Sequence, residues 1–382
     1  MPAVFLVMIA AYALINLWIL FWYGRALRGA KYARSIACLA LLTLMLCSLS
    51  FILLDGASWL RIILARAGNV WLGSFFYVFV LTLVADLFAL LRRLLLKTPV
   101  RDKNAPRFKA AVSILGIVLI LAIGGWISAA LPVLREERVT VAAGRPDLRP
   151  ITIAALSDMH LGRTITVARF ERALDLLTPH KPDIVLLLGD IFDDHFLLDE
   201  AAMAAVIDRL APPLGAWAVL GNHEYYVGLD KSLRVFEACG IRVLRDQWAV
   251  IDGTFVLIGR EDYGSFRFTG EDRKQIADIM ADLPEKARDL PLILMDHQPQ
   301  KLQEAEEAGV ALQLSGHTHD AQLWPFNLIL PYIYENPLGW SQRGETRYYA
   351  SAGAGTWGPP MRNTARPEVL FFRVEFAEKP RP

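Results

Sequence analysis

Histidine is concentrated at a few points of the chain. Seven histidines occur in the 382 residues, and five of them lie in four short polar motifs. These motifs are Asp158-Met-His160, Gly221-Asn222-His223-Glu224, Asp296-His297 and Gly316-His317-Thr318-His319, and a fifth motif, Gly189-Asp190-Ile-Phe-Asp193, adds carboxylates. Imidazole and carboxylate together are the ligands of hydrolytic metal centres. Two metals about 3.5 to 4 Å apart are the usual arrangement for cleaving phosphate esters.

Each motif taken singly has an ordinary structural explanation, because Asp-x-His can be a turn or a helix cap and Gly-Asn is itself a turn dipeptide. The five motifs nevertheless share one context. Each follows a short apolar run of strand type, at residues 151–156, 184–188, 217–220, 292–295 and 311–314. Loops at the carboxyl ends of strands form the sites of layered α/β proteins, so the motifs are predicted to converge on one edge.

Helical segments separate these runs, for example the apolar residues at 167, 170, 174 and 177. Residues 250–252 and 255–258 are predicted to form a hairpin through Gly253, and 369–374 a further strand. The pattern predicts an α/β domain over 150–382, with two sheets packed face to face and helices outside. Residues 135–149 are polar and are predicted to be a linker.

The first part of the chain is strongly apolar. Four stretches approach or exceed the roughly 20 residues that span a bilayer as a helix: Ala3–Tyr23, Ile36–Leu54, Val70–Leu91 and Ala110–Val133. Buried core helices are the alternative, but the stretches lack a polar stripe. Residues 1–134 are therefore predicted to be an all-α bundle of four transmembrane helices. Asp86, inside the third stretch, is either functional or paired with the nearby Arg92 and Arg93.

The short loops between these stretches differ in charge. Loop two carries Arg61 and Arg66, whereas loops one and three are richer in cations: Arg25, Arg28, Lys31 and Arg34, then Arg92, Arg93, Lys97, Arg101, Lys103, Arg107 and Lys109. Because basic loops stay in the cytoplasm, everything after Val133 is predicted to face outward, the periplasmic or extracellular side of a bacterial plasma (inner) membrane. Residues 1–134 have a net charge of +10, which leaves −9 for the remainder. An acidic domain is a poor partner for nucleic acid.

The ordered series Asp-x-His, Gly-Asp-x-x-Asp, Gly-Asn-His-Glu, His and Gly-His-x-His resembles the calcineurin-like metallophosphoesterase superfamily over about 151–374. The ending Gly353-Ala-Gly-Thr-Trp-Gly-Pro-Pro-Met-Arg362 is similar to its bacterial membrane-associated branch of YkuE-like phosphohydrolases. The resemblance implies a four-layer β-sandwich flanked by helices and two divalent metal ions, commonly Mn, Fe or Zn. One departure is Asp320-Ala321, where relatives in this branch often have a glycine.

The resemblance also implies roles for individual residues. Asp190 would bridge the two metals, and His223 would act on the scissile phosphate without binding metal. Either Asp193 or Glu224 would orient a ring. The remaining ligands would be Asp158, His160 and His319 for one metal, and Asn222, His297 and His317 for the other.

The function expected from these residues is a membrane-anchored phosphoesterase acting on a phosphomonoester or phosphodiester, through in-line attack of metal-bound hydroxide. Anchoring favours a membrane lipid, such as a lipid-linked phosphate, as substrate. One alternative is a sensor or scaffold that binds a phosphorylated ligand without turnover. A nuclease is the second alternative, and the net negative charge of the soluble domain disfavours it. Arg163 and Arg362 either hold the substrate phosphate or form surface ion pairs. His195 either lines the pocket or lies in an exposed loop. The run Leu323–Tyr334 is either a lipid-facing lip or a core strand.

Overall fold

The computed structural model describes residues 3–49, 59–96, 105–143, 148–162, 165–193 and 200–378. The chain divides into two compact units. The first contains Met1–Ile127 with Gly358–Met361, and the second contains Ser128–Trp357 with Arg362–Pro382. Arg163 and His195 lie outside the described residues.

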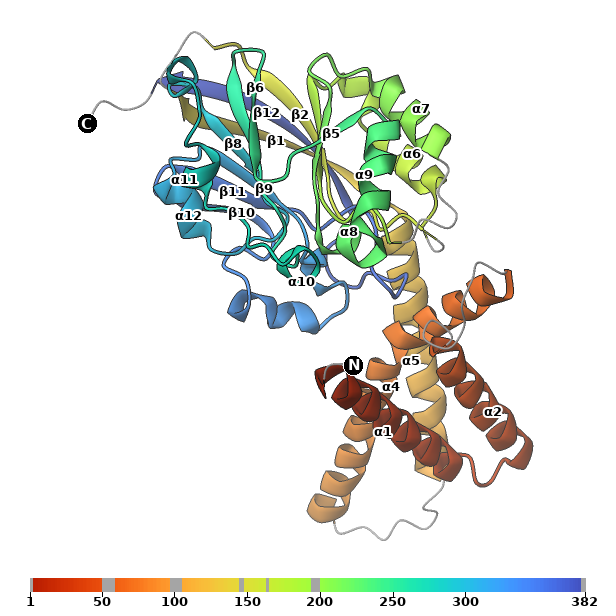
Figure 1. The fold of residues 1–382 in the computed structure, drawn as a ribbon. Helices are drawn as coiled ribbons and strands as arrows, with labels where there is room; N and C mark the ends of the chain where they lie inside the picture. The colour runs from red at the N-terminus through yellow and green to blue at the C-terminus, as the bar shows by residue number, and fades with distance from the viewer. Residues whose placement is uncertain are drawn as a thin grey trace. The chain divides into compact units, whose positions relative to one another are not determined.

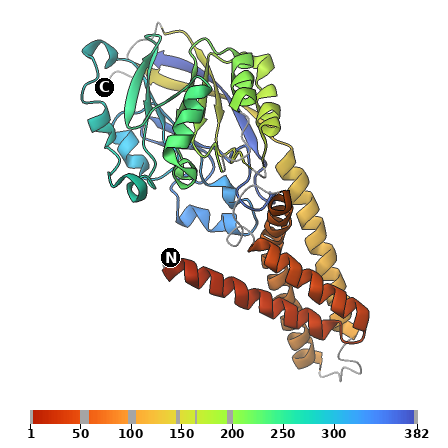
Figure 2. The same cartoon turned by 45° about the vertical axis from the view of Figure 1, so that its right-hand side comes forward.

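The first unit is built from four long apolar helices, coloured red to yellow in Figures 1 and 2: α1 (Ala3–Ala26), α2 (Lys31–Ser48), α4 (Trp59–Leu96) and α5 (Ala105–Ala130). All four are long and apolar enough to cross a membrane. The four predicted spans are therefore confirmed as helices of this kind. Helix α4 begins at Trp59, ahead of the predicted Val70, and residues 50–54 of the second span lie outside the described residues.

Two polar contacts join neighbouring helices of this unit. Trp71 Nε1 of α4 donates to Asn16 Oδ1 of α1 at 2.8 Å, a bond that satisfies two polar groups in an apolar setting. Asp86 of α4 lies 3.7 Å from Arg107 Nη2 of α5. The ion pair expected for Asp86 is therefore present, but Arg107 on the next helix forms it.

The second unit contains two six-stranded mixed sheets. One has the order β1-β12-β2-β3-β4-β5 and the other the order β10-β11-β9-β8-β7-β6. The strands of the first are β1 (Val133–Ala143), β2 (Ile151–Leu156), β3 (Ile184–Leu188), β4 (Ala216–Val219), β5 (Ile241–Val243) and β12 (Glu368–Glu378). Those of the second are β6 (Gln247–Ile251), β7 (Phe255–Gly259), β8 (Leu292–Met295), β9 (Leu312–Ser315), β10 (Gly339–Arg343) and β11 (Thr346–Ala350).

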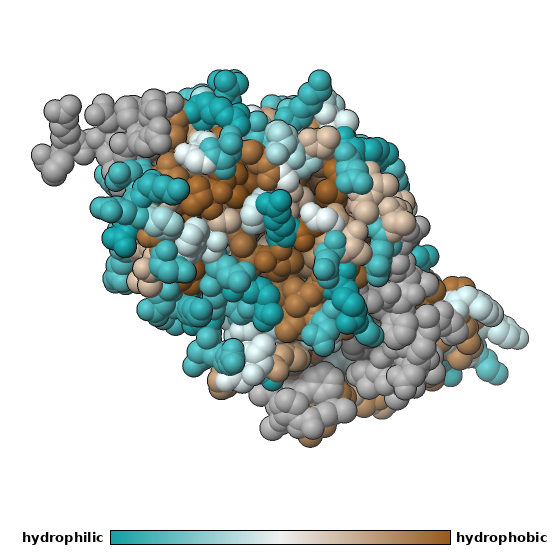
Figure 3. Space-filling view, turned by 45° about the horizontal axis from the view of Figure 1, so that its top comes forward, coloured by the Kyte–Doolittle hydropathy of each residue, from teal (hydrophilic) through white to brown (hydrophobic). Residues whose placement is uncertain are grey.

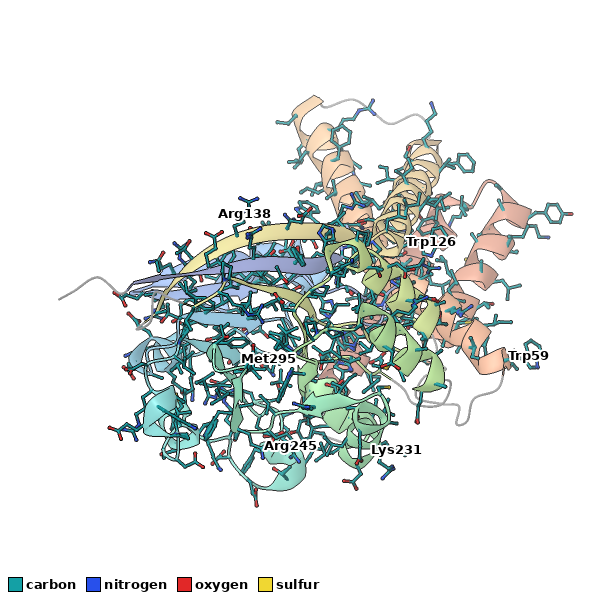
Figure 4. All side chains as sticks on the ribbon, turned by 90° about the horizontal axis from the view of Figure 1, so that it is seen from above. Trp59, Trp126, Arg138, Lys231, Arg245 and Met295 are labelled. Carbon is teal, nitrogen blue, oxygen red and sulfur yellow. The ribbon has the colours of Figure 1, made fainter. Side chains whose placement is uncertain are left out.

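The sheets pack face to face and helices cover their outer faces (Figure 1), which gives the four layers that were predicted. The first sheet is covered by α6 (Val167–Asp175), α7 (Glu200–Leu210) and α9 (Leu229–Ala238), and the second by α11 (Ile276–Ile279), η2 (Glu285–Ala287) and α12 (Leu302–Glu307). Met295 at the end of β8 is fully buried and lies deep among the side chains in Figure 4, whereas Lys231 lies at the periphery. Polar side chains surround smaller apolar patches on the face in Figure 3.

The predicted linker at 135–149 is wrong for its first part, because residues 133–143 form strand β1. This strand pairs in parallel with β12 along its whole length, from Val133↔Glu368 to Ala143↔Glu378. It is an edge strand whose polar half is exposed, and only its later part alternates buried and exposed residues. The polar half also bonds to β12 through side chains, since Arg135 Nε donates to Glu368 at 2.5 Å. A solvated edge strand of this kind lacks the apolar signal on which the sequence prediction depended.

Candidate metal centre

The loops that follow β2 and β9 bring the first set of donor atoms together. Asp158 and His160 follow β2, and His319 begins the short turn η3 (His319–Ala321) after β9. His160 Nε2 lies 3.0 Å from His319 Nε2, which in turn lies 3.3 Å from Asp158 Oδ1. These three residues, which we call the first donor group, have donor atoms within 4.8 Å of one another and are buried.

The loops after β3, β8 and β9 form a second donor group, consisting of Asp190, His297 and His317. His297 Nε2 lies 3.2 Å from Asp190 Oδ2 and 3.3 Å from His317 Nδ1. Asn222 begins helix α8 (Asn222–Val227) after β4, and its neighbour His223 donates its backbone N–H to Asp190 Oδ1 at 2.8 Å. The predicted residues thus lie around one edge formed by both sheets.

The backbone is left-handed at five of these positions: Asp158, His160, Asp190, His317 and His319 have φ between 52° and 73°. Such backbone conformations cost energy for residues other than glycine, and they cluster at functional sites. Gly189, with φ of 92°, shows how closely the chain approaches the site, because an added Cβ would lie 2.6 Å from His297 Nδ1. The sharp turn expected before Asp190 therefore needs a glycine.

Glu224 anchors the loops that carry these donors. Its fully buried carboxylate accepts four backbone N–H groups, from Asp190 at 2.9 Å, Ile191 at 2.7 Å, Phe192 at 3.0 Å and Gly221 at 2.7 Å. These bonds tie the loop after β3 to the start of α8. Glu224 therefore holds backbone in place, and the sequence prediction had left open whether it orients a ring.

Replacing Glu224 with glutamine should lower the free energy of unfolding of the second unit by about 2 to 3 kcal/mol, because an amide NH₂ would face buried N–H donors. Urea or thermal unfolding of the detergent-solubilised protein measures the change. Glu237→Gln, an exposed position on α9, is the matched control and should stay within about 0.5 kcal/mol of wild type. Equal unfolding curves for the two variants would contradict the anchoring role.

Asp193 is the acid that contacts the ring of His223. Its Oδ1 lies 2.7 Å from His223 Nδ1, and the aromatic rings of Tyr226 and Trp357 flank the same imidazole at 5.2 and 5.9 Å. Burial alone would lower the pKa of His223, but the hydrogen bond to Asp193 and the nearby charge of Asp190 outweigh it and raise that pKa to about 9. The contact with Asp193 engages Nδ1 and leaves Nε2 for another partner.

The two histidines after β9 are held in the neutral form that metal coordination requires. Burial, followed by the charge of His297, lowers the pKa of His317 to about 3. Burial and the neighbouring guanidinium of Arg362 lower the pKa of His319 well below its usual value. Both rings are therefore neutral in the absence of bound cations.

The donor atoms fit divalent cations by three observations. Asn222 Oδ1 is buried and has no hydrogen-bond partner among the described residues, as expected of an oxygen that coordinates a metal ion. His297 Nδ1 lies 2.7 Å from the carbonyl oxygen of Leu188, and this leaves Nε2 for coordination. His317 Nε2 lies 2.9 Å from the Tyr334 hydroxyl, which leaves Nδ1. Second partners of this kind orient metal-binding imidazoles, and mixed nitrogen and oxygen donors suit divalent metal ions.

Tyr334 was not singled out by sequence reasoning, since its proximity to His317 arises only from the fold. Tyr334→Phe should weaken Mn²⁺ binding about tenfold through loss of ring orientation, with little effect on thermal stability. Isothermal titration of the metal-free protein measures this. Tyr332→Phe is the matched control, because Tyr332 is 90 % exposed and should bind Mn²⁺ as the wild type does. A Tyr334→Phe variant with unchanged affinity would exclude the orienting role.

Arg362 is buried beside the first donor group, which contradicts the surface ion pair considered from sequence. Its side chain is buried, and its Nη2 lies 2.8 Å from His319 Nδ1 and donates to the Gly355 carbonyl at 2.7 Å. It is therefore not on the surface, and its Nη1 is buried without a hydrogen-bond partner among the described residues. The departure at Asp320-Ala321 is accommodated by left-handed backbone, with φ of 49° and 55°. Asp320 Oδ2 helps to hold this turn by accepting the Ala365 N–H at 3.0 Å.

Comparison with known proteins agrees with this geometry. Residues 151–321 match the family described as calcineurin-like phosphoesterase. A metallophosphoesterase of Aquifex aeolicus is 35 % identical over 245 residues, which are 63 % of this chain and 92 % of that protein. The chain belongs to the metallophosphoesterase family.

Two further metallophosphoesterases show how widely the likeness extends. YkuE of Bacillus subtilis is 28 % identical over 58 % of this chain and 78 % of its own length. A transmembrane protein with metallophosphoesterase domain from Danio rerio is 26 % identical over 81 % of this chain and 72 % of its own length. Together with the four candidate spans, these relatives indicate a membrane metallophosphoesterase with residues that can bind divalent metal.

Proposed function

We propose that the protein is a membrane-anchored phosphoesterase that hydrolyses a phosphomonoester or phosphodiester at a centre of two divalent cations. The first donor group and Asn222 with the second donor group would each hold one cation. When bound, such cations polarise a phosphoryl group and make water a stronger nucleophile.

The observation that carries this proposal is the position of Asp190. Its Oδ2 lies 4.0 Å from His160 Nε2 of the first donor group and 3.2 Å from His297 Nε2 of the second. A carboxylate that faces both donor groups is suited to bridge two cations. Its pKa is depressed because neighbouring imidazoles, His297 first, outweigh the effect of burial.

His223 is suited to act on the substrate rather than on a metal. Asp193 holds Nδ1, so the protonated ring can present Nε2 to a phosphoryl oxygen or a leaving group. Tyr226 and Trp357 border the same ring, and they limit how a substrate can approach. The predicted role of His223 therefore has a physical basis in its partners.

Hydrolysis of p-nitrophenyl phosphate and of bis(p-nitrophenyl) phosphate tests the proposal. The purified full-length protein should lose activity after chelation and regain it with Mn²⁺, and the preferred ester distinguishes a monoesterase from a diesterase. A Mn²⁺-loaded protein that binds phosphate but hydrolyses neither ester would instead support a sensor or scaffold.

We also propose that the second unit faces the periplasm or the cell exterior, because the loops before α2 and after α4 are the basic ones. Alkaline phosphatase fused after residue 378 should be active in bacterial cells, and a fluorescent protein at the same point should be dark. Bright cytoplasmic fluorescence would reverse the orientation.

A further inference from the structure

An apolar segment connects β9 to β10 beside the metal centre. Residues 324–333, which we call the lip, contain no charged side chain. They form two short turns, η4 (Phe326–Leu328) and η5 (Leu330–Tyr332), rather than the core strand considered from sequence. Backbone bonds such as Ile329 N to Phe326 O at 3.0 Å stabilise the turns. The lip is therefore an ordered structure on the surface of the second unit.

Most large side chains of the lip are exposed. Leu330 is buried, but the others have exposed fractions of 56 % at Trp324, 37 % at Phe326, 60 % at Leu328, 52 % at Ile329, 90 % at Tyr332 and 59 % at Ile333. Single exposed apolar residues are common, whereas a contiguous run of them marks a surface that contacts another molecule or a membrane. The lip is such a run.

Both ends of the lip are tied to the site. Before it, the Gln322 side chain accepts the Trp357 N–H at 2.7 Å and donates to the Trp357 carbonyl at 2.9 Å. After it, the Tyr334 hydroxyl contacts His317 at 2.9 Å. These bonds fix both ends of the lip close to the second donor group, while most of its apolar side chains are exposed.

More aromatic side chains are exposed near His223. Tyr226 on α8 is 56 % exposed and lies 5.7 Å from Phe268 on α10 (Phe266–Thr269), which is 50 % exposed. Trp357, 57 % exposed, borders His223 from the loop that Gln322 holds. The apolar surface is therefore not confined to the lip, and it includes rings that touch the imidazole proposed to act on substrate.

We propose that the lip inserts into the interfacial layer of the lipid bilayer, so that the metal centre opens at the membrane surface. The four candidate spans of the same chain keep a bilayer at high effective concentration, whereas a second copy must be met by diffusion. The composition also fits this partner, because Trp and Tyr favour the headgroup level and Leu and Ile favour the acyl region. The consequence that the substrate is a lipid-borne phosphate rests on the proposed phosphoesterase function.

The test uses the full-length protein in phosphatidylcholine and phosphatidylglycerol vesicles. An environment-sensitive fluorophore is attached at Leu328→Cys or Tyr332→Cys after Cys38, Cys47 and Cys239 are replaced by serine. Glu345→Cys, an exposed position in the turn between β10 and β11, is the control. Lipids with a nitroxide on the acyl chain should quench the lip labels about threefold more strongly than the control label, because quenching requires contact with the acyl region.

Equal and weak quenching at all three labels would overturn the proposal. A blue shift of the lip labels without quenching by lipid would also overturn it, since that result indicates burial against protein, such as a second copy. The readout does not depend on hydrolysis. An inactive protein with an inserted lip would therefore contradict only the proposed function, and an active protein with a solvated lip would contradict only this inference.

Discussion

Replacing Asp190 with asparagine should lower kcat/KM for p-nitrophenyl phosphate about a thousandfold, which corresponds to roughly 4 kcal/mol of transition-state stabilisation. The carboxylate faces both donor groups, so the loss of its charge should weaken the binding of both proposed cations. Asparagine keeps an acceptor for the His223 N–H, now 2.8 Å from Oδ1, and it tolerates the left-handed backbone of this position. The variant should therefore fold.

Metal content and activity should fall together in this variant. Inductively coupled plasma mass spectrometry of Mn²⁺-loaded protein, after removal of free metal, measures the number of bound ions. Asp208→Asn, at an exposed position on α7, is the matched control and should retain wild-type metal content and activity. If Asp190→Asn retained both, Asp190 would not bridge two cations.

The strands that carry the motifs could be predicted closely from sequence. The runs expected at 151–156, 184–188 and 292–295 coincide with β2, β3 and β8, and all three strands are buried along almost their whole length. Buried strands need continuous apolar residues, and each polar motif begins where that apolar run ends. The same physical change therefore marks both the end of the strand and the start of the site.

Strand β1 and the partner of His223 could not be predicted, because each depends on contacts between segments that are distant in sequence. Strand β1 is stabilised by β12 from the far end of the chain, and its own polar residues suggest a linker. Likewise, the choice between Asp193 and Glu224 as the partner of His223 depends on how two loops turn toward each other. Glu224 is adjacent to His223 in sequence, yet its carboxylate points to backbone N–H groups after β3.

The same limit applies to Arg362 and to the lip. The type of residue suggested phosphate binding or a surface ion pair for Arg362, and the fold excludes the surface by burying the guanidinium against His319 and Gly355. Apolar composition left the lip undecided between core and surface, because a buried strand and a membrane-facing turn have similar residues. Burial in the folded chain distinguishes them, and burial is a property of neighbours that are distant in sequence.

His223→Ala should reduce kcat about a hundredfold to ten-thousandfold, the range over which a positioned general acid contributes. The loss should be larger for phenyl phosphate than for p-nitrophenyl phosphate, because the more basic leaving group needs the proton more. His180→Ala is the control, since that imidazole packs against Phe371 at 4.9 Å and has no part in either donor group. A His223→Ala enzyme as fast as this control would exclude His223 from the reaction.

Asp193→Asn should cause a smaller loss in the same direction, because it removes the partner that holds Nδ1 of His223 at 2.7 Å. Since Asp193 acts through the ring, the double variant should be no slower than His223→Ala alone. Independent, multiplicative losses would mean that Asp193 contributes separately, for instance through its 3.6 Å contact with His160 of the first donor group. Mn²⁺ affinity separates the two routes, because a variant that disturbs only the ring of His223 should bind metal as the wild type does.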